Sequence, residues 1–171
     1  MSAKNLAIFA SGRGSNAKAI LEKEADYNYS VKLIVVSRKD ALAIDIAKEF
    51  DIPYLVLNKQ SFQETKQILK SLEQYQVQII CLAGFLWKIP NYIIQAYRDR
   101  IVNIHPSLLP KYGGKGMYGI KVHEAVVENH ETYSGITIHL VNEEYDKGRV
   151  LLQERIPQAE PEIPQRLQGF C

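Results

Sequence analysis

The residues best suited to chemistry lie at the end of one apolar run, Ile101-Val102-Asn103-Ile104-His105, which Pro106 terminates. The run is mostly β-branched, which predicts a buried strand, and residues two apart on a strand share a face. Asn103 and His105 should therefore point the same way at the carboxyl end of that strand. An amide can donate to a developing oxyanion, and an imidazole can exchange a proton near neutral pH. The pair suits acyl transfer, although an Asn and a His that only satisfy a turn would give the same pattern.

A glycine-rich segment near the start, Gly12-Arg13-Gly14-Ser15-Asn16-Ala17, lies between an apolar run and a helical pattern. Glycines let the backbone approach a ligand closely, and amides at the start of a helix attract an anion. A phosphate monoester would fit this segment. The pattern also matches the dinucleotide fingerprint G-x-G-x-x-A, and Arg38 after the next strand could meet a 2′-phosphate, so NADP binding stays open. A tight turn without a ligand is the third interpretation.

Asp146 precedes Lys147 and Gly148 between two predicted strands. Asp before glycine is most often a turn residue. It could instead place a carboxylate beside His105, and that charge would hold the imidazole protonated. The four histidines of the chain have no metal-like spacing and no cysteine partners, so we expect no metal.

Strand and helix patterns alternate along the chain, which predicts an α/β fold with a doubly wound, mostly parallel sheet flanked by helices. In such a sheet, ligands bind at the carboxyl ends of the strands. The expected strands are 6–10, 31–36, 54–57, 77–83, 101–104, 135–141 and 150–156. The expected helices are 17–22, 41–50, 61–75, 89–96 and 120–129, the third opened by a capping box at Ser61 and Glu64. Residues 111–119 are glycine-rich and aperiodic, which indicates a functional loop.

Length and composition limit the class of protein. A chain of 171 residues with 46% hydrophobic and 23% charged residues is typical of one globular domain. A net charge of +2 without a Lys/Arg cluster favours small-molecule partners and no nucleic acid. Cys81 and Cys171 make no disulfide framework, which favours the cytoplasm. We see no signal peptide and no apolar run of about 20 residues, so we expect no membrane association.

Asn103-Ile104-His105-Pro106-Ser107-Leu108-Leu109-Pro110 resembles the signature of the folate-dependent formyltransferases. Two further stretches fit the same family: Ser11-Gly12-Arg13-Gly14-Ser15-Asn16 resembles its phosphate loop, and Tyr145-Asp146-Lys147-Gly148 resembles its late Asp-x-Gly loop. Ala83-Gly84-Phe85-Leu86 also fits. The matches follow the family order from residue 5 to about residue 156, so the resemblance does not depend on a single motif.

The resemblance implies a Rossmann-like formyltransferase domain over residues 1–156 and a short, truncated tail over 157–171, where relatives continue as a helix. It implies transfer of a formyl group from 10-formyltetrahydrofolate, a co-substrate, to the amine of glycinamide ribonucleotide in purine biosynthesis, by a monomer or homodimer. The implied catalytic residues are Asn103, His105 and Asp146. Gly14, Ser15 and Asn16 would hold the substrate phosphate, and Leu86, Trp87, Lys88, Ile89 and Asn103 would surround the folate.

The resemblance also implies a cis Leu109–Pro110 bond and a supporting role for His139, and it leaves the roles of Lys111 and Lys115 open. Leu86-Trp87 stands where relatives often have Met-Arg, so backbone contacts to the folate are better supported than side-chain contacts. Formyltetrahydrofolate hydrolase and methionyl-tRNA formyltransferase share the core motifs. The phosphate loop favours an amine acceptor over hydrolysis, and 171 residues leave no room for the second, tRNA-binding domain. An NADP-binding module is the alternative outside the family.

Overall fold

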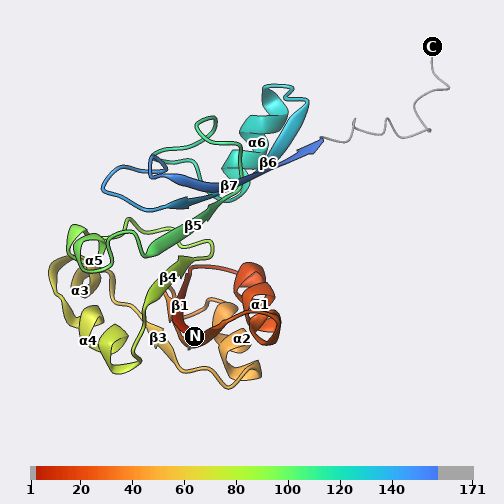
Figure 1. Cartoon of the computed structure of the whole chain (residues 1–171). Coiled ribbons are helices and arrows are strands. Elements are labelled where there is room, and N and C mark those ends of the chain that lie inside the picture. Colours follow the sequence, from red (N-terminus) through yellow and green to blue (C-terminus); the bar gives the residue numbers. More distant parts are fainter. Residues whose placement is uncertain (1–2, 158–171) are drawn as a thin grey trace, which may run out of the picture.

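A seven-stranded sheet forms the centre of the computed structural model, which describes residues 3–157. Its strands follow the order β3-β2-β1-β4-β5-β6-β7 (Figure 1). They are β1 (Lys4–Ala10), β2 (Tyr29–Val36), β3 (Tyr54–Val56), β4 (Ile79–Leu82), β5 (Ile101–His105), β6 (Tyr133–Leu140) and β7 (Val150–Pro157). β1 to β5 pair in parallel, and β6 and β7 pair antiparallel to their neighbours. The predicted doubly wound, mostly parallel sheet is confirmed.

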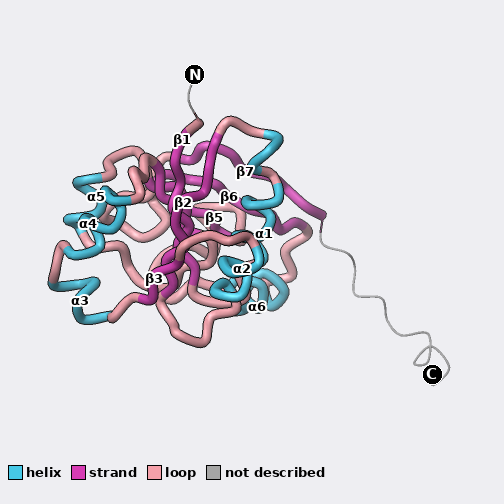
Figure 2. Tube along the Cα trace, turned by 90° about the horizontal axis from the view of Figure 1, so that it is seen from below, coloured by secondary structure: helices cyan, strands magenta, loops and turns pink. Residues whose placement is uncertain are grey.

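Helices cover both faces of the sheet. They are α1 (Ser15–Glu22), the 3-10 helix η1 (Glu24–Asp26), α2 (Ala43–Glu49), α3 (Lys59–Glu64), α4 (Gln67–Gln74), α5 (Asn91–Ala96) and α6 (Ile120–Glu128). Figure 2 shows α3, α4 and α5 on one side of the strands and α1 and α2 on the other. The parallel strands β1 and β2 are therefore buried on both faces, as their near-continuous apolar residues require.

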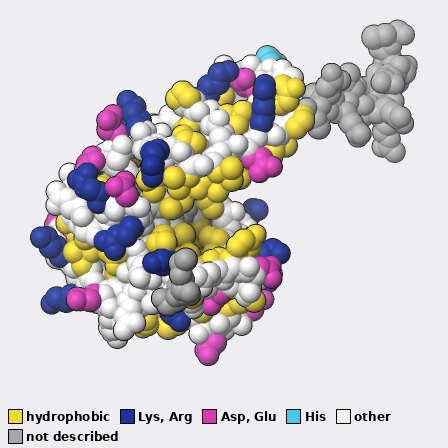
Figure 3. Space-filling model, viewed as in Figure 1, with side chains coloured by type: hydrophobic (Ala, Val, Ile, Leu, Met, Phe, Trp, Pro, Cys, Tyr) yellow, Lys and Arg dark blue, Asp and Glu magenta, His cyan; other side chains and the backbone are white. Residues whose placement is uncertain are grey.

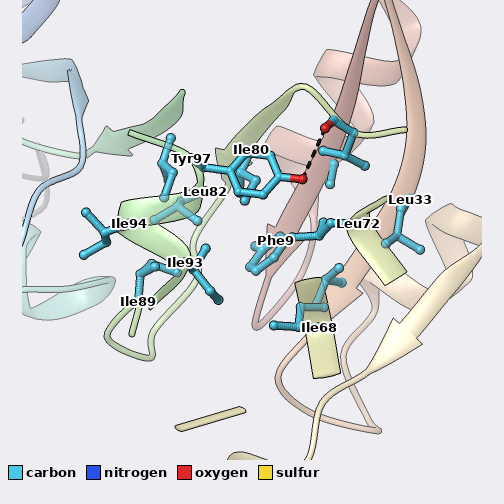
Figure 4. Close-up of a cluster of buried hydrophobic side chains, with 14 of the residues drawn as sticks. Phe9, Leu33, Ile68, Leu72, Ile80, Leu82, Ile89, Ile93, Ile94 and Tyr97 are labelled. Carbon is cyan, nitrogen blue, oxygen red and sulfur yellow. Dashed lines mark hydrogen bonds between the residues drawn. The ribbon is translucent and has the colours of Figure 1, made fainter. Parts of the chain in front are cut away.

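The alternation of side chains along β1 divides the core into two clusters. Ala7 and Phe9 join the cluster under α3, α4 and α5, while Leu6 and Ile8 join the cluster under α1 and α2. Figure 4 shows Phe9 in the first cluster among the helix residues that fill it. The carboxyl end of β1 is thereby fixed from both sides, and the glycine-rich segment begins directly after it.

The strand order places β2 and β4 on opposite sides of β1, and a doubly wound sheet opens a crevice where its order reverses. β5 lies next to β4 and ends at the same edge. β6 then pairs with β5 so that His139 lies opposite Asn103 and Thr137 opposite His105. The two residues singled out on β5 therefore reach the ligand edge beside a second histidine.

One predicted helix is wrong. Residues 61–75 form two helices, α3 and α4, because Thr65 is extended, with φ −121° and ψ 150°. The Ser61–Glu64 capping box does not open α3 either. Asn58 is the N-cap, and its side chain accepts from the Ser61 N–H at 3.0 Å.

Three further expectations can be compared with the structure. The Leu109–Pro110 peptide is cis, as predicted. Residues 111–119 lie between β5 and α6 without helix or strand, which confirms the loop. Of the tail expected over 157–171, Pro157 ends β7 and residues 158–171 lie outside the described part.

Gly14 is fixed by packing, and this makes the first testable prediction. Its φ is +74°, and an added Cβ would lie 2.8 Å from Ile46 Cδ1 and 2.9 Å from Ala43 Cα on α2. Gly14→Ala should therefore lower the free energy of unfolding by about 1–3 kcal/mol, measured by urea denaturation. Gly12→Ala is the matched control, since a Cβ there would meet no atom within 4 Å. Equal stability of the two variants would contradict this account of the loop.

Candidate active site

A cleft of about 830 Å³ opens at the carboxyl ends of β4 and β5. Its walls come from the loop after β1, the loop after β4, the end of β5, the loop before α6 and the turn between β6 and β7. Figure 3 shows a hollow with hydrophobic walls on one side of the molecule. Nearly all predicted site residues line this cleft: Ser15, Asn16, Leu86, Trp87, Lys88, Ile89, Asn103, His105 and Asp146.

His105 is buried at the end of β5, with 4% of its surface exposed. Its Nε2 lies 2.8 Å from the Tyr112 carbonyl oxygen, which can only accept, so Nε2 carries a proton. Its Nδ1 lies 3.6 Å from Asp146 Oδ1. At that distance the carboxylate acts through its charge more than through a direct hydrogen bond. Each ring nitrogen of His105 therefore faces an acceptor, the Tyr112 carbonyl at Nε2 and the Asp146 carboxylate near Nδ1.

Asp146 projects from the turn between β6 and β7 and is largely buried, with 12% of its side chain exposed. Its Oδ2 accepts from the Gly114 N–H at 2.8 Å, and its Oδ1 faces both His105 and His139. Burial alone would raise the pKa of Asp146, but the His139 ring, the Gly114 N–H and the charge of His105 together lower it below its ordinary range. The carboxylate is therefore charged at neutral pH.

Asn103 and His139 meet across the β5–β6 pair. His139 is 2% exposed, and its Nδ1 donates to the Leu140 carbonyl oxygen at 2.9 Å. Asn103 Nδ2 lies 3.1 Å from His139 Nε2, and the same nitrogen is 3.5 Å from Asp146 Oδ1. The histidine thus holds the Asn103 amide at the cleft, which Asn103 lines. His139, expected to have a supporting role, thus contacts Asn103 and lies within ion-pair distance of Asp146.

The glycine-rich segment after β1 presents Ser15 and Asn16 to the cleft, together with Arg13. Ser15 is the first residue of α1, so first-turn amides lie beside these side chains. The N-cap is Gly14, which has no side chain to accept from those amides. Gly14 itself is buried against α2 and is not among the residues that line the cleft.

The opposite wall is the loop after β4. Leu86 is 46% exposed, and Trp87 packs against Phe62 and Phe85 with ring centroids 5.9 and 6.1 Å away. The Lys88 ammonium lies 5.3 Å from the Tyr145 ring centroid, which joins this loop to the turn that carries Asp146. The loop therefore offers a largely apolar, aromatic-backed surface beside the polar centre.

Sequence reasoning missed several groups that hold the site. The Tyr112 carbonyl and the Gly114 N–H are backbone groups, which have no residue-type signal. Buried Ser11 accepts from the Leu86 N–H at 2.9 Å and from the Ser37 hydroxyl at 2.6 Å. Ser11 follows β1 directly and Ser37 follows β2 directly. Because the two strands are neighbours, this placement could have indicated from the sequence that the two hydroxyls lie close together.

Some kinds of chemistry find no support among the described residues. Within residues 3–157, no three His, Cys, Asp or Glu side chains are grouped so that they could hold a metal ion. Over the same residues, no helix is both long and apolar enough for a membrane span. Burial raises the pKa of the Cys81 thiol to about 11, so this thiol stays protonated at neutral pH and is a poor nucleophile.

Comparison with known proteins points to one family. The family described as Formyl transferase matches residues 4–168. A phosphoribosylglycinamide formyltransferase of Bacillus subtilis is 35% identical over 159 residues, covering 90% of this chain and 79% of that protein. A chloroplastic phosphoribosylglycinamide formyltransferase of Arabidopsis thaliana is 43% identical over 171 residues, covering 96% of this chain and 59% of the relative.

The solved structures agree. Glycinamide ribonucleotide transformylase 1 from Geobacillus kaustophilus superposes with a TM-score of 0.84 at 33% identity, covering 97% of this chain and 89% of that one. These matches confirm the resemblance found in the sequence. The chain spans only 59% and 51% of the length of two plant relatives.

The charge of Asp146 should make stability depend on pH in a defined direction. Its pKa is lower in the folded protein, so its contribution is fully present above the ordinary Asp value of about 3.9 and is lost as pH falls below that. We expect the difference in unfolding free energy between wild type and Asp146→Asn to shrink between pH 5 and pH 2, measured by urea denaturation. Asp45→Asn, at an exposed carboxylate on α2, is the control and should run parallel to wild type. A constant difference for Asp146→Asn would refute the assignment.

Proposed function

The chain belongs to the formyl transferase family, and on that premise we propose that it moves the formyl group of 10-formyltetrahydrofolate to the amine of glycinamide ribonucleotide, in purine biosynthesis. One observation carries the proposal: Asn103, His105 and Asp146 meet in one cleft between a phosphate-type loop and an apolar wall. Ser15 and Asn16 suit the phosphate of the ribonucleotide, and the 86–89 loop suits the flat folate. The acceptor amine and the formyl donor would then meet beside His105.

The reaction needs an oxyanion stabilised and a proton moved. The amine nitrogen attacks the formyl carbon, a C–N bond forms, and the carbonyl electrons move to oxygen. In this mechanism, the amide of Asn103 and the imidazolium of His105 stabilise that oxyanion. The intermediate then collapses, the bond from the formyl carbon to the folate nitrogen breaks, and the folate nitrogen takes a proton.

His105 is the proton donor in this proposal. Its Nδ1 is the less constrained nitrogen, since Asp146 lies 3.6 Å away while the Tyr112 carbonyl binds Nε2 at 2.8 Å. The proton lost by the attacking amine restores the imidazolium. Neither Ser nor Cys is needed as a nucleophile, so transfer is direct from donor to acceptor.

Two other activities give distinct results in the same assay. A formyltetrahydrofolate hydrolase would release formate without the ribonucleotide, whereas the Arg13, Ser15 and Asn16 end of the cleft supports an acceptor with a phosphate. An NADP-binding module would quench or shift nicotinamide fluorescence and produce no tetrahydrofolate. We favour formyl transfer because the cleft joins an anion-binding end to an oxyanion-stabilising centre.

The remaining expectations belong to the same proposal. We propose small-molecule partners only, without nucleic acid or membrane, and a monomer or homodimer in the cytoplasm. The cytoplasmic location rests on the use of cysteine in the sequence. Cell fractionation and light scattering of the purified protein test these points.

The deciding experiment mixes the protein with glycinamide ribonucleotide and 10-formyltetrahydrofolate and follows tetrahydrofolate by absorbance. Turnover that requires both substrates supports the proposal, and formate release without the ribonucleotide contradicts it. His105→Ala should lose about 100- to 1,000-fold in kcat at every pH, as removal of an oxyanion donor typically does.

Asp146→Asn should lose turnover at pH 7 and regain part of it at lower pH, where the imidazolium forms without the carboxylate. Asn16→Ala is the matched binding variant, and it should raise the KM for the ribonucleotide while leaving folate affinity unchanged. If Asp146→Asn kept near-normal turnover and an unshifted pH profile, Asp146 would be only a turn residue.

A further inference from the structure

The orientation of His105 depends on a single peptide group outside its own strand. The Tyr112 carbonyl accepts from His105 Nε2 at 2.8 Å, the shorter of the two contacts that fix the ring. The other charged groups near the ring are Asp146, which faces Nδ1, and His139, which shares the Asp146 oxygen. Whatever fixes the Tyr112 peptide therefore also fixes the imidazole.

Tyr112 holds an unusual backbone conformation. Its φ is +55°, in the left-handed region that non-glycine residues seldom adopt and that glycine reaches easily. The neighbouring Gly113 is constrained differently, since an added Cβ would lie 2.5 Å from Leu109 Cδ2 and 3.3 Å from Asp146 Cβ. Because glycine would adopt this backbone conformation more easily, we expect the side chain of Tyr112 to make a specific contact.

The side chain of Tyr112 is anchored at a distance from the cleft. Its hydroxyl donates to Glu131 Oε1 at 2.9 Å, and Lys111 Nζ binds the same oxygen at 2.7 Å. Glu131 follows α6, and its backbone N–H donates to the carbonyl of the buried Val126 at 3.2 Å. The hydroxyl thus ties the loop that carries the Tyr112 carbonyl to the packed end of α6.

The anchor and the catalytic cleft are separate. Tyr112 and Glu131 line a smaller cavity of about 420 Å³ with Tyr133 and Arg155, and neither is among the residues that line the large cleft. Removal of the Tyr112 hydroxyl therefore leaves the lining of the large cleft unchanged. An effect on catalysis would have to pass through the carbonyl and His105.

We propose that Tyr112 is a positioning residue: its hydroxyl bond to Glu131 fixes its carbonyl as the acceptor for His105 Nε2 and so holds the imidazolium ready for formyl transfer. This inference rests on the proposed function. The pair acts on the catalytic histidine from outside the cleft, so it should change kcat and its pH dependence and leave substrate binding unchanged.

The test compares Tyr112→Phe with Tyr133→Phe, a tyrosine of the same cavity that loses only its hydroxyl. Tyr112→Phe should lower kcat about 3- to 10-fold, as expected for one hydrogen bond, with KM unchanged for both substrates. In the pH–rate profile of this variant, the decline of kcat at alkaline pH should begin at a lower pH than in the wild type, because the His105 imidazolium is held less well. Tyr133→Phe should match wild type. Equal kcat and equal pH profiles for wild type and Tyr112→Phe would overturn the proposal, as would an equal loss in both variants.

Further variants at Glu131 and Tyr112 test the same hydrogen bond from its other partner and separate it from the backbone conformation of residue 112. Glu131→Ala should lose at least as much as Tyr112→Phe, because it removes the hydroxyl bond and the Lys111 ion pair together, and the double variant should lose no more than Glu131→Ala alone. Tyr112→Gly relieves the left-handed backbone but removes the anchor. We expect it to be as slow as Tyr112→Phe, and wild-type kcat in that variant would assign position 112 to backbone conformation alone.

The test also separates this inference from the proposed function. If wild type makes no tetrahydrofolate, formyl transfer fails, and the anchor is judged by proton NMR of the His105 ring. A lower titration midpoint in Tyr112→Phe than in wild type supports the anchor, and equal midpoints overturn it.

Discussion

A buried imidazole with an acceptor at each ring nitrogen is the interaction on which the site depends. His105 is only 4% exposed, so a charge on its ring would have to be balanced by the protein. Asp146 supplies the balancing charge, and the Tyr112 carbonyl fixes the proton on Nε2. The turn that carries Asp146 must approach the β6 backbone very closely to bring the carboxylate to His105. A Cβ on Gly148 would lie 1.7 Å from the Leu140 carbonyl oxygen, so the turn that carries Asp146 can close only over glycine.

The sheet explains why these groups meet. β5 brings Asn103 and His105 to the ligand edge, and the antiparallel β6–β7 pair returns Asp146 and His139 to the same point. Parallel strands alone would have carried their following loops to helices on the outer faces. The buried Ser11 hydroxyl accepts from both Leu86 N–H and Ser37, so the loop after β1 and the loop after β4 keep a fixed spacing. The two ends of the cleft are thus linked through the Ser11 hydroxyl.

Some of this could be predicted from residue types alone. The period of two along 101–105 placed Asn103 and His105 on one face, and the apolar runs predicted the parallel strands. The helix break at Thr65 could not be found, because Ser61 and Glu64 mimic a capping box while the actual cap is Asn58. The approach of Asp146 to His105 spans 41 residues of sequence, and only the family resemblance indicated it. No residue pattern could have indicated that the Tyr112 carbonyl contacts His105, since every residue has a backbone carbonyl.

The proposed mechanism requires that Asp146 keep His105 a cation at neutral pH. The most direct test is nitrogen NMR of the His105 ring at pH 7, with the signal assigned by its loss in His105→Ala. Both ring nitrogens should carry protons in the wild type, and one should be bare in Asp146→Asn. A neutral His105 ring in the wild type, with Nδ1 bare toward Asp146, would contradict the account.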